Sequence, residues 1–185
     1  ERNQPFTAQS VASLRRGYRP QRFTVLGTET DATIVLALRN ADNPERDGVI
    51  VWLRSTPAGF ETLAMVDIPS RPEDVAARSI DEVVVVDSTD TVYFGGRQGL
   101  NPSTAYPARD MRYVSFLQNG QLVIGTRDSF VVGNLPFPET FRITELNEPT
   151  GLPVSSPVRG VVEFEGDRWV ATSQRGFYRA DPEAQ

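Results

Sequence analysis

The chain has 185 residues, 39% of them hydrophobic, with 14 Gly, 14 Pro and a formal net charge of −5, which describes one globular domain broken by many turns. It contains no His and no Cys, so disulfides, thiolate or imidazole metal sites, and Ser/His/Asp or Cys/His catalytic arrangements are excluded. The acidic balance argues against a general nucleic-acid binder, and the longest apolar runs fall far short of the roughly 20 residues that a membrane-spanning helix needs.

All 19 basic residues are arginine, and they are unevenly placed. Residues 1–22 hold five arginines against the single Glu1, which makes a basic N-terminal arm of charge +4 before a body, residues 23–185, of charge −9. The arm has too few apolar side chains to fold alone, although its residues 7–16 can form a short amphipathic helix. We expect the arm to be either mobile or docked on the acidic body or on a partner chain. The side chains available to anchor it are Phe6, Val11, Leu14 and Tyr18.

The body begins with the apolar segments 23–38, 48–53 and 60–68. The sequences TIVLALR and GVIVWLR predict two paired strands joined by the polar loop 40–48, and residues 60–68 predict the outer strand of the same unit. Residues 72–79 begin with a proline and can form a second short helix. Helix is otherwise scarce in the pattern.

Three later segments share one pattern: Ile80–Leu100, Arg112–Val132 and Arg159–Arg179. Each contains an apolar strand, a tight polar turn, a second strand that ends in small residues, another turn and a third short strand. Asn119-Gly120 is the clearest turn signal, because a type I′ hairpin turn needs positive φ at both central residues. The pattern predicts that six residues lie in central strands of consecutive sheets, with neighbours facing opposite sides. They are Tyr93, Phe94, Val123, Ile124, Trp169 and Val170.

Each of these pairs is followed by a small residue, Gly95, Gly125 or Ala171. Small residues are expected where strands crowd toward a central axis. Equivalent positions in successive units are separated by about 30 and then about 46 residues, so the units differ in length. We expect the shorter unit to have lost its outer strand.

The motif Trp169-Val170-Ala171-Thr172, followed by the aromatic stretch 176–181, resembles the short propeller repeats of bacterial two-component sensor proteins. Residues 122–126 and 93–96 look like degenerate copies of it. The resemblance covers about half the chain. It implies an all-β fold of β-propeller-type repeats with about four blades, which form either a small ring or part of a larger or split propeller. It also implies a binding role and carries over no catalytic residue.

Paired carboxylates offer one alternative reading. Glu163 and Glu165 stand two residues apart on one predicted strand, hence on one face, with Asp167 just beyond, and two carboxylates can catalyse glycoside hydrolysis. A solvated strand face beside a hairpin explains these residues better. Trp52 and Trp169 lie inside strand patterns, which favours a core role over stacking on a sugar.

Two acidic groups and one glycine-rich stretch raise further alternatives. Asp87 with Asp90, and Asp42 with Asp47, can supply oxygen ligands to a hard cation, but neither group has the alternation of a calcium loop and turn chemistry explains both better. Residues 94–99 are glycine-rich but open no helix, so they lack the physical basis of a phosphate site.

We therefore predict a non-enzymatic module of a bacterial protein for protein–protein interaction or sensing, with no cofactor, no bound metal, no nucleic-acid partner and no membrane span. A carbohydrate-binding or carbohydrate-active propeller domain is the alternative. The expected partner is a protein, or another chain that completes the propeller. The chain starts at Glu rather than Met, as a processed or excised piece does, and a periplasmic or extracellular location is expected. Candidate contact residues, chosen because Tyr and Arg are enriched at binding hot spots, are Arg15, Arg16, Tyr18, Arg19, Arg22, Tyr106 and Tyr113.

Overall fold

The structure is a computed structural model that describes residues 15–28, 31–103, 109–127, 129–134, 137–142, 157–173 and 176–180. For residues 137–142 and for Ala180 only the backbone is described. Most of the predicted arm, including the stretch 7–14, lies outside these residues, and so does Tyr106. Every regular element in the described part is a β-strand, as the all-β prediction requires. No helix in the described part is long and apolar enough to cross a membrane.

Four antiparallel sheets follow one another along the chain. The first sheet contains β1 (Tyr18–Leu26), β2 (Thr33–Asn40), β3 (Gly48–Thr56) and β4 (Gly59–Ile68). The second contains β5 (Pro72–Ser79), β6 (Glu82–Asp87), β7 (Val92–Gly96) and β8 (Gly99–Ser103). The third contains β9 (Tyr113–Phe116), β10 (Leu122–Gly125), β11 (Ser129–Asn134) and β12 (Phe137–Arg142). The fourth contains β13 (Val158–Phe164), β14 (Asp167–Thr172) and β15 (Gly176–Ala180).

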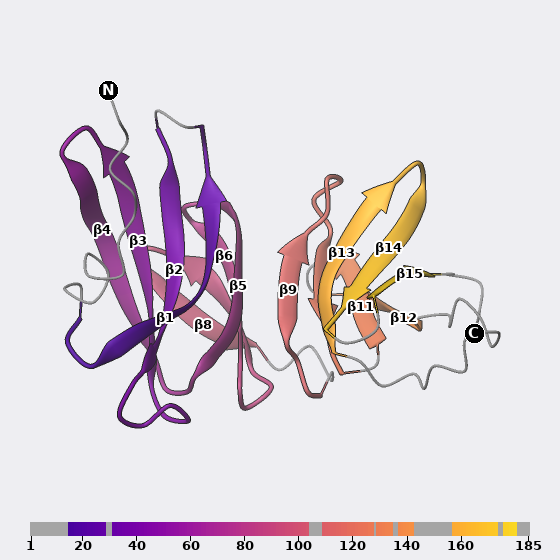
Figure 1. The fold of residues 1–185 in the computed structure, drawn as a ribbon, viewed down its shortest axis with the longest axis horizontal. Helices are drawn as coiled ribbons and strands as arrows, with labels where there is room; N and C mark the ends of the chain where they lie inside the picture. Colours follow the sequence, from indigo (N-terminus) through magenta and orange to yellow (C-terminus); the bar gives the residue numbers. More distant parts are fainter. Residues whose placement is uncertain are drawn as a thin grey trace.

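The first strands of successive sheets contact one another. β1 contacts β5, β5 contacts β9, and β9 contacts β13, and we call these four the inner strands. The remaining strands of each sheet follow outward in chain order. Figure 1 shows a row of sheets with β1–β4 at one end and β13–β15 at the other. This arrangement of four up-and-down sheets is a propeller-type fold.

Apolar side chains fill the three spaces between neighbouring sheets. Trp52 lies completely buried in the first space and donates a hydrogen bond from Nε1 to the carbonyl oxygen of Ile80 at 3.1 Å. Ile124 and Met111 lie in the second space, and Phe130 lies in the third. The core role that the sequence favours is therefore confirmed for Trp52. It is wrong for Trp169, which is half-buried and belongs to none of the clusters between the sheets.

A fourth cluster lies on the face of the first sheet that points away from the second sheet. Its members come from the two middle strands of that sheet, β2 and β3, and each is at most 2% exposed. Tyr18 and Ile34 are the described partly buried apolar side chains that pack against it. We call this group the outward cluster, and it consists of Leu36, Leu38, Val49, Val51 and Leu53.

The outward face of the fourth sheet is also apolar but uncovered. The strand register aligns Val162 with Trp169, and Ala171 with Phe177, on the face opposite to the third sheet. Val162, Phe164 and Phe177 are exposed by 55%, 63% and 72% respectively. The two ends of the row therefore present apolar surfaces in different states.

Residues 72–79 form the inner strand β5, so the prediction of a short helix there is wrong. The first five residues of the strand are buried, and β5 packs between the inner strands β1 and β9. This packing, together with the hydrogen-bonded ladder to β6, outweighs the helix-start signal of Pro72. Because the sequence pattern did not reveal β5, the aligned units paired β6 and β7 with β9 and β10. The true equivalents of β9 and β10 are β5 and β6, so the alignment was wrong by one strand.

The predicted central strands are confirmed: β7, β10 and β14 are all interior strands of their sheets. Val123 and Ile124 illustrate the alternation, because Val123 packs toward the fourth sheet and Ile124 toward the second. The predicted strands 60–68 and 48–53 are also present as β4 and β3. The first strand begins at Tyr18, five residues before the predicted start at Phe23.

The expectation that the shorter unit has lost its outer strand is wrong. The second and third sheets each contain four strands, and the three-stranded sheet of the described part is the fourth. The small residue at Gly125 does mark a crowded position, because a Cβ there would lie 2.7 Å from Val158 of β13. Gly95 is small for a different reason, since its Cβ would meet the Gly99 carbonyl oxygen of its own hairpin at 2.1 Å.

Candidate binding site at the inner rim

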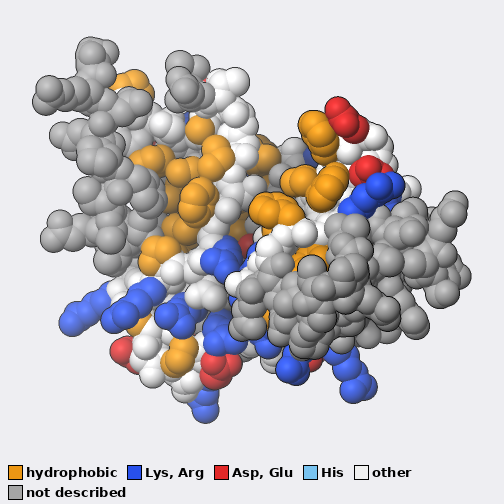
Figure 2. Space-filling view, turned by 45° about the vertical axis from the view of Figure 1, so that its right-hand side comes forward, with side chains coloured by type: hydrophobic (Ala, Val, Ile, Leu, Met, Phe, Trp, Pro, Cys, Tyr) orange, Lys and Arg blue, Asp and Glu red, His pale blue; other side chains and the backbone are white. Residues whose placement is uncertain are grey.

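The inner strands all begin at the same end of the molecule, which is the lower end in Figure 1. Charged side chains gather where they begin. Figure 2 shows arginine side chains along the lower part of the molecule, below a more apolar surface. We call one charged group near these strand starts the inner rim: Glu73 and Asp74 of β5, Arg112 just before β9, Arg159 of β13, and Arg22, which lies further along β1 beside Asp74.

Asp74 is the most deeply placed member of the rim. Its side chain is 11% exposed, and its two oxygens accept hydrogen bonds from the backbone N–H groups of Val75 and Val114, each at 3.0 Å. Asp74 therefore ties the second sheet to the third. Burial raises the pKa of its carboxyl to about 6, although these hydrogen bonds and the positive charges of Arg22 and Arg159 act in the opposite direction.

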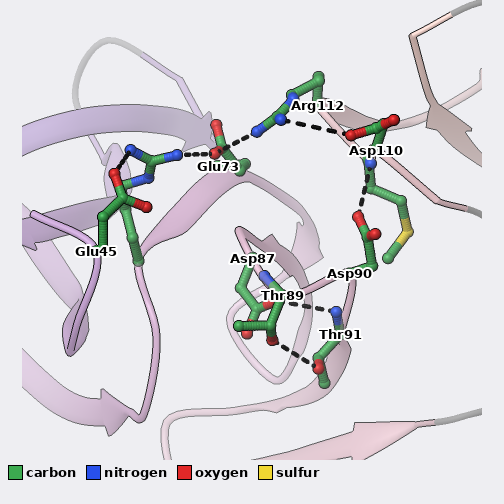
Figure 3. Close-up of polar contacts among 10 residues, drawn as sticks. Glu45, Glu73, Asp87, Thr89, Asp90, Thr91, Asp110 and Arg112 are labelled. Atoms are coloured by element: carbon green, nitrogen blue, oxygen red, sulfur yellow. Dashed lines mark hydrogen bonds and ion pairs between the residues drawn. The ribbon is translucent and has the colours of Figure 1, made fainter.

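Glu73 joins two guanidinium groups from different parts of the chain, as Figure 3 shows. Its Oε1 lies 2.5 Å from Arg71 Nη2 and 2.6 Å from Arg112 Nη1. Arg71 also contacts Glu45 at 2.5 Å, and Arg112 lies 3.8 Å from Asp110. Charge-assisted contacts of this kind fix side-chain positions, so the rim is a preorganised network.

The positive charge that the rim offers to solvent lies in Arg22 and Arg159. The other two arginines of the network, Arg71 and Arg112, are paired with Glu45, Glu73 and Asp110. Arg22 is 3.9 Å from Asp74, but 46% of its side chain is exposed. Arg159 is exposed and has no ion-pair partner in the described part of the chain. The rim can therefore receive an anionic group from solvent.

The turn between β6 and β7, beside the rim, is held by two aspartates. Asp87 is completely buried and accepts hydrogen bonds from the backbone N–H groups of Thr89 and Thr91, each at 2.9 Å. Asp90, in the same turn, accepts a hydrogen bond from the Met111 N–H at 3.0 Å, which joins the second sheet to the segment before β9. These contacts agree with the turn chemistry favoured by the sequence.

Arg15 and Tyr18, two of the predicted contact residues, lie together. The Arg15 guanidinium stands 4.7 Å from the centre of the Tyr18 ring and forms an ion pair with Asp67 of β4. The Tyr18 hydroxyl donates a hydrogen bond to Asp47, and this bond raises the pKa of Tyr18 and lowers that of Asp47. Both side chains are therefore engaged with the first sheet.

The remaining predicted contact residues are scattered. Arg16 and Arg19 are exposed near the start of β1, and Arg22 belongs to the inner rim. Tyr113 is half-buried between the third and fourth sheets, where its hydroxyl accepts a hydrogen bond from the Val161 N–H at 3.3 Å. Tyr106 lies outside the described residues. The structure thus brings Arg22 alone of this group into the rim among the residues it describes.

The acidic group of the last hairpin is held by arginines. Glu163 lies 3.2 Å from Arg168, and Asp167 lies 3.1 Å from Arg179. Glu165 does not share a strand face with Glu163, because β13 ends at Phe164 and Glu165 adopts a positive φ of 52° in the turn. The same-face pairing that the sequence suggested is therefore wrong.

The metal readings find no geometric support within the described ranges. No cluster of three Asp or Glu side chains suited to a metal ion occurs there. Asp47 is occupied by Tyr18 and by Asn40, whose Nδ2 donates to it at 3.1 Å. The glycine-rich residues 94–99 form the β7–β8 hairpin, not a phosphate loop.

Sequence reasoning missed Glu73, Asp74, Arg112 and Arg159. The first two lie in the stretch interpreted as a short helix, and the last two stand at the edges of the aligned units. The signal available in the sequence was position, because each of these four residues stands just before an apolar strand or near its start. Recognising residues 72–79 as a strand would have aligned these charges at the starts of the inner strands.

No known family model matches this chain, and no curated protein matches it. Several solved structures have a similar fold, among them the following two. A protein of unknown function from Bacteroides caccae is similar over 85% of this chain and 57% of its own length, with 18% identity and a TM-score of 0.57. YCF48, solved bound to a D1 peptide, is similar over 91% of this chain and 65% of its own length, with 11% identity and a TM-score of 0.53.

These similarities show the fold alone, because both sequence identities are low. The chain spans about three fifths of the length of the two solved structures. The similarity to YCF48 supports the propeller-type reading and gives no support to the sensor-protein repeats in particular. Neither structure points to catalysis.

Proposed function

We propose that this protein is a non-enzymatic binding module that takes an acidic segment of a protein partner at the inner rim. The observation that carries the proposal is the pair of exposed arginines, Arg22 and Arg159, which flank the buried Asp74 on inner strands of different sheets. The similar fold of YCF48, which was solved with a bound peptide, supports a peptide ligand.

The chemistry of the rim suits carboxylates. A guanidinium group offers several donors in a planar fork and pairs with a carboxylate through two parallel hydrogen bonds. Glu73 and its two arginine partners hold the centre of the rim in place, so little conformational freedom is lost when a ligand binds. Arg22 and Arg159, whose side chains are exposed, can then close on side-chain carboxylates of the ligand.

Fluorescence anisotropy tests the proposal with a short fluorescein-labelled Glu-Ser peptide and its Gln-Ser counterpart. We expect the acidic peptide to bind and the neutral peptide to bind at least about tenfold more weakly, because charge-assisted hydrogen bonds contribute about 1.5–3 kcal/mol each. The double variant Arg22→Gln/Arg159→Gln should lose about tenfold or more in affinity. Arg54→Gln is the matched control, since Arg54 is equally exposed (48%) near the far end of β3. Equal binding of both peptides, or an equal loss in the control, contradicts the proposal.

The affinity should also depend on pH. Asp74 has a pKa of about 6, so it gains a proton as the pH falls from 7 to 5, while the Glu side chains of the peptide, with pKa values near 4.3, stay mostly charged. The rim therefore becomes more positive, and binding should tighten by a few-fold over this range. Asp74→Asn should remove that dependence. An affinity that weakens on acidification would show that Asp74 does not face the ligand.

The carbohydrate alternative has a direct test in the same assay. A sugar site needs an aromatic platform beside its carboxylates, and the aromatic residue nearest in sequence to Arg112, Tyr113, is turned toward Val161. We therefore expect a panel of neutral oligosaccharides to leave the bound acidic peptide in place. Displacement by any of them would favour a lectin-like role instead.

A further inference from the structure

The outward cluster of the first sheet is buried although it points away from the rest of the row. Its five side chains are between 0 and 2% exposed. The second sheet lies on the opposite face, where Val35 and Trp52 pack against it. Tyr18 and Ile34 are too few to remove five apolar side chains from water, so further atoms must lie on this face.

The covered area is a narrow strip. Burial is confined to the two middle strands, whereas Phe23 and Val25 of β1 are exposed by 65% and 52%, and Met65 of β4 by 42%. The register places all three on this same face, because Phe23 pairs with Leu36, Val25 with Ile34, and Met65 with Val51. A second sheet would cover all four strands, since neighbouring strands are only about 4.8 Å apart. The strip has the width of a single chain segment.

The first described residues, from Arg15 on, lie beside this strip. Arg15 pairs with Asp67, which the register aligns with Val49 of the outward cluster. The Tyr18 ring packs against the cluster, and the Gly17 carbonyl oxygen accepts a hydrogen bond from the Ala41 N–H at 2.7 Å. The described part of the chain therefore begins at the edge of the strip.

We propose that residues 1–14 lie across the outward cluster and cap the first sheet of their own chain. Fourteen residues reach about 46 Å when extended or about 21 Å as a helix, and either length spans the strip. Val11 and Leu14 are three residues apart, so one helical turn would place both on the side toward the sheet, next to Tyr18 at the start of β1. The ion pair of Arg15 is exposed and adds little, which leaves the apolar contacts as the main anchor.

A spin label tests this cap without disturbing its apolar anchors. The chain has no native Cys, so Gln9→Cys carries a single nitroxide. We expect the amide NMR signals of Leu36 and Val51 to be lost to paramagnetic broadening, while those of Val162 and Val170 in the fourth sheet persist. As a matched control, a nitroxide at Asn119→Cys in the β9–β10 turn should leave the first sheet unbroadened.

Two further measurements make the result decisive. Val11→Ser/Leu14→Ser should abolish the broadening from Gln9→Cys, with unchanged signals in the fourth sheet showing that the fold is intact. Mixing spin-labelled chain with isotope-labelled, spin-free chain should give no broadening. Broadening in the mixed sample would assign the cover to a second copy, and a sharp Leu36 signal in the singly labelled chain would overturn the cap. Neither result depends on the ligand at the inner rim.

Discussion

The first and fourth sheets stand at opposite ends of one row, and both carry apolar side chains on the face that points away from the row. In the first sheet the middle of that face is at most 2% exposed. In the fourth sheet Val162, Phe164 and Phe177 are 55–72% exposed. Similar strand patterns thus lead to a covered face at one end and an open face at the other.

The difference shows that an apolar strand face is not evidence of burial by itself. Burial of a terminal sheet depends on what lies beyond it, whereas an interior sheet is always packed on both faces. Apolar patches that stay exposed mark surfaces that contact something else. The two end faces should therefore respond differently to the same kind of substitution.

The largest expected effect is at the covered end. Leu36→Ala removes a side chain that is 2% exposed, so the free energy of unfolding should fall by about 2–5 kcal/mol, as for other large-to-small core changes. Urea denaturation followed by circular dichroism measures it. A loss below about 0.5 kcal/mol would mean that the first face is as open as the fourth.

An intermediate effect is expected where the fourth sheet joins the third. Gly125→Ala places a Cβ 2.7 Å from Val158 and 3.2 Å from Tyr113, so β13 must shift, at a cost of about 1–3 kcal/mol. Limited digestion with trypsin, which cuts after arginine, should then cleave faster at Arg168 and Arg179. Cleavage at Arg39 in the first sheet should keep its original rate. Equal acceleration at both ends would show that the two sheets open as one unit.

The smallest effect is expected at the open face. Phe177→Ser changes a side chain that is 72% exposed, so the free energy of unfolding should change by no more than about 0.5 kcal/mol. The same urea titration measures it. A loss of 2 kcal/mol or more would reveal that the fourth face is covered in solution, and native mass spectrometry would then identify a second chain.

The sequence was sufficient to predict strands where hairpin turns punctuate them. Asn119-Gly120 and Glu165-Gly166 both lie in tight turns, but only the second has positive φ at both residues. At the first, Gly120 alone has positive φ, so the type I′ geometry predicted for Asn119-Gly120 is wrong. The sequence was insufficient at β5, because the proline and acidic residues that start this strand also suit the start of a helix, and only packing between β1 and β9 decides between them.

The inner rim was out of reach for a related reason. Arg22, Asp74 and Arg159 are separated by about 50 and then 85 residues in the chain, and only the parallel course of the inner strands brings them together. The unusual pKa of Asp74 arises from burial, which a sequence does not display. The network therefore follows from the strand order, and an error of one strand was enough to hide it.

Within the described residues, the fourth sheet has a neighbouring sheet on one side only, and it has three strands where the others have four. Its amides should therefore fray before the rest of the protein, through a sub-global opening that leaves the first three sheets intact. In native-state hydrogen exchange, Val170 in β14 should exchange earlier than Val85 in β6, which is enclosed on both faces. The molecule would lose its structure in a fixed direction, peeling from its C-terminal end.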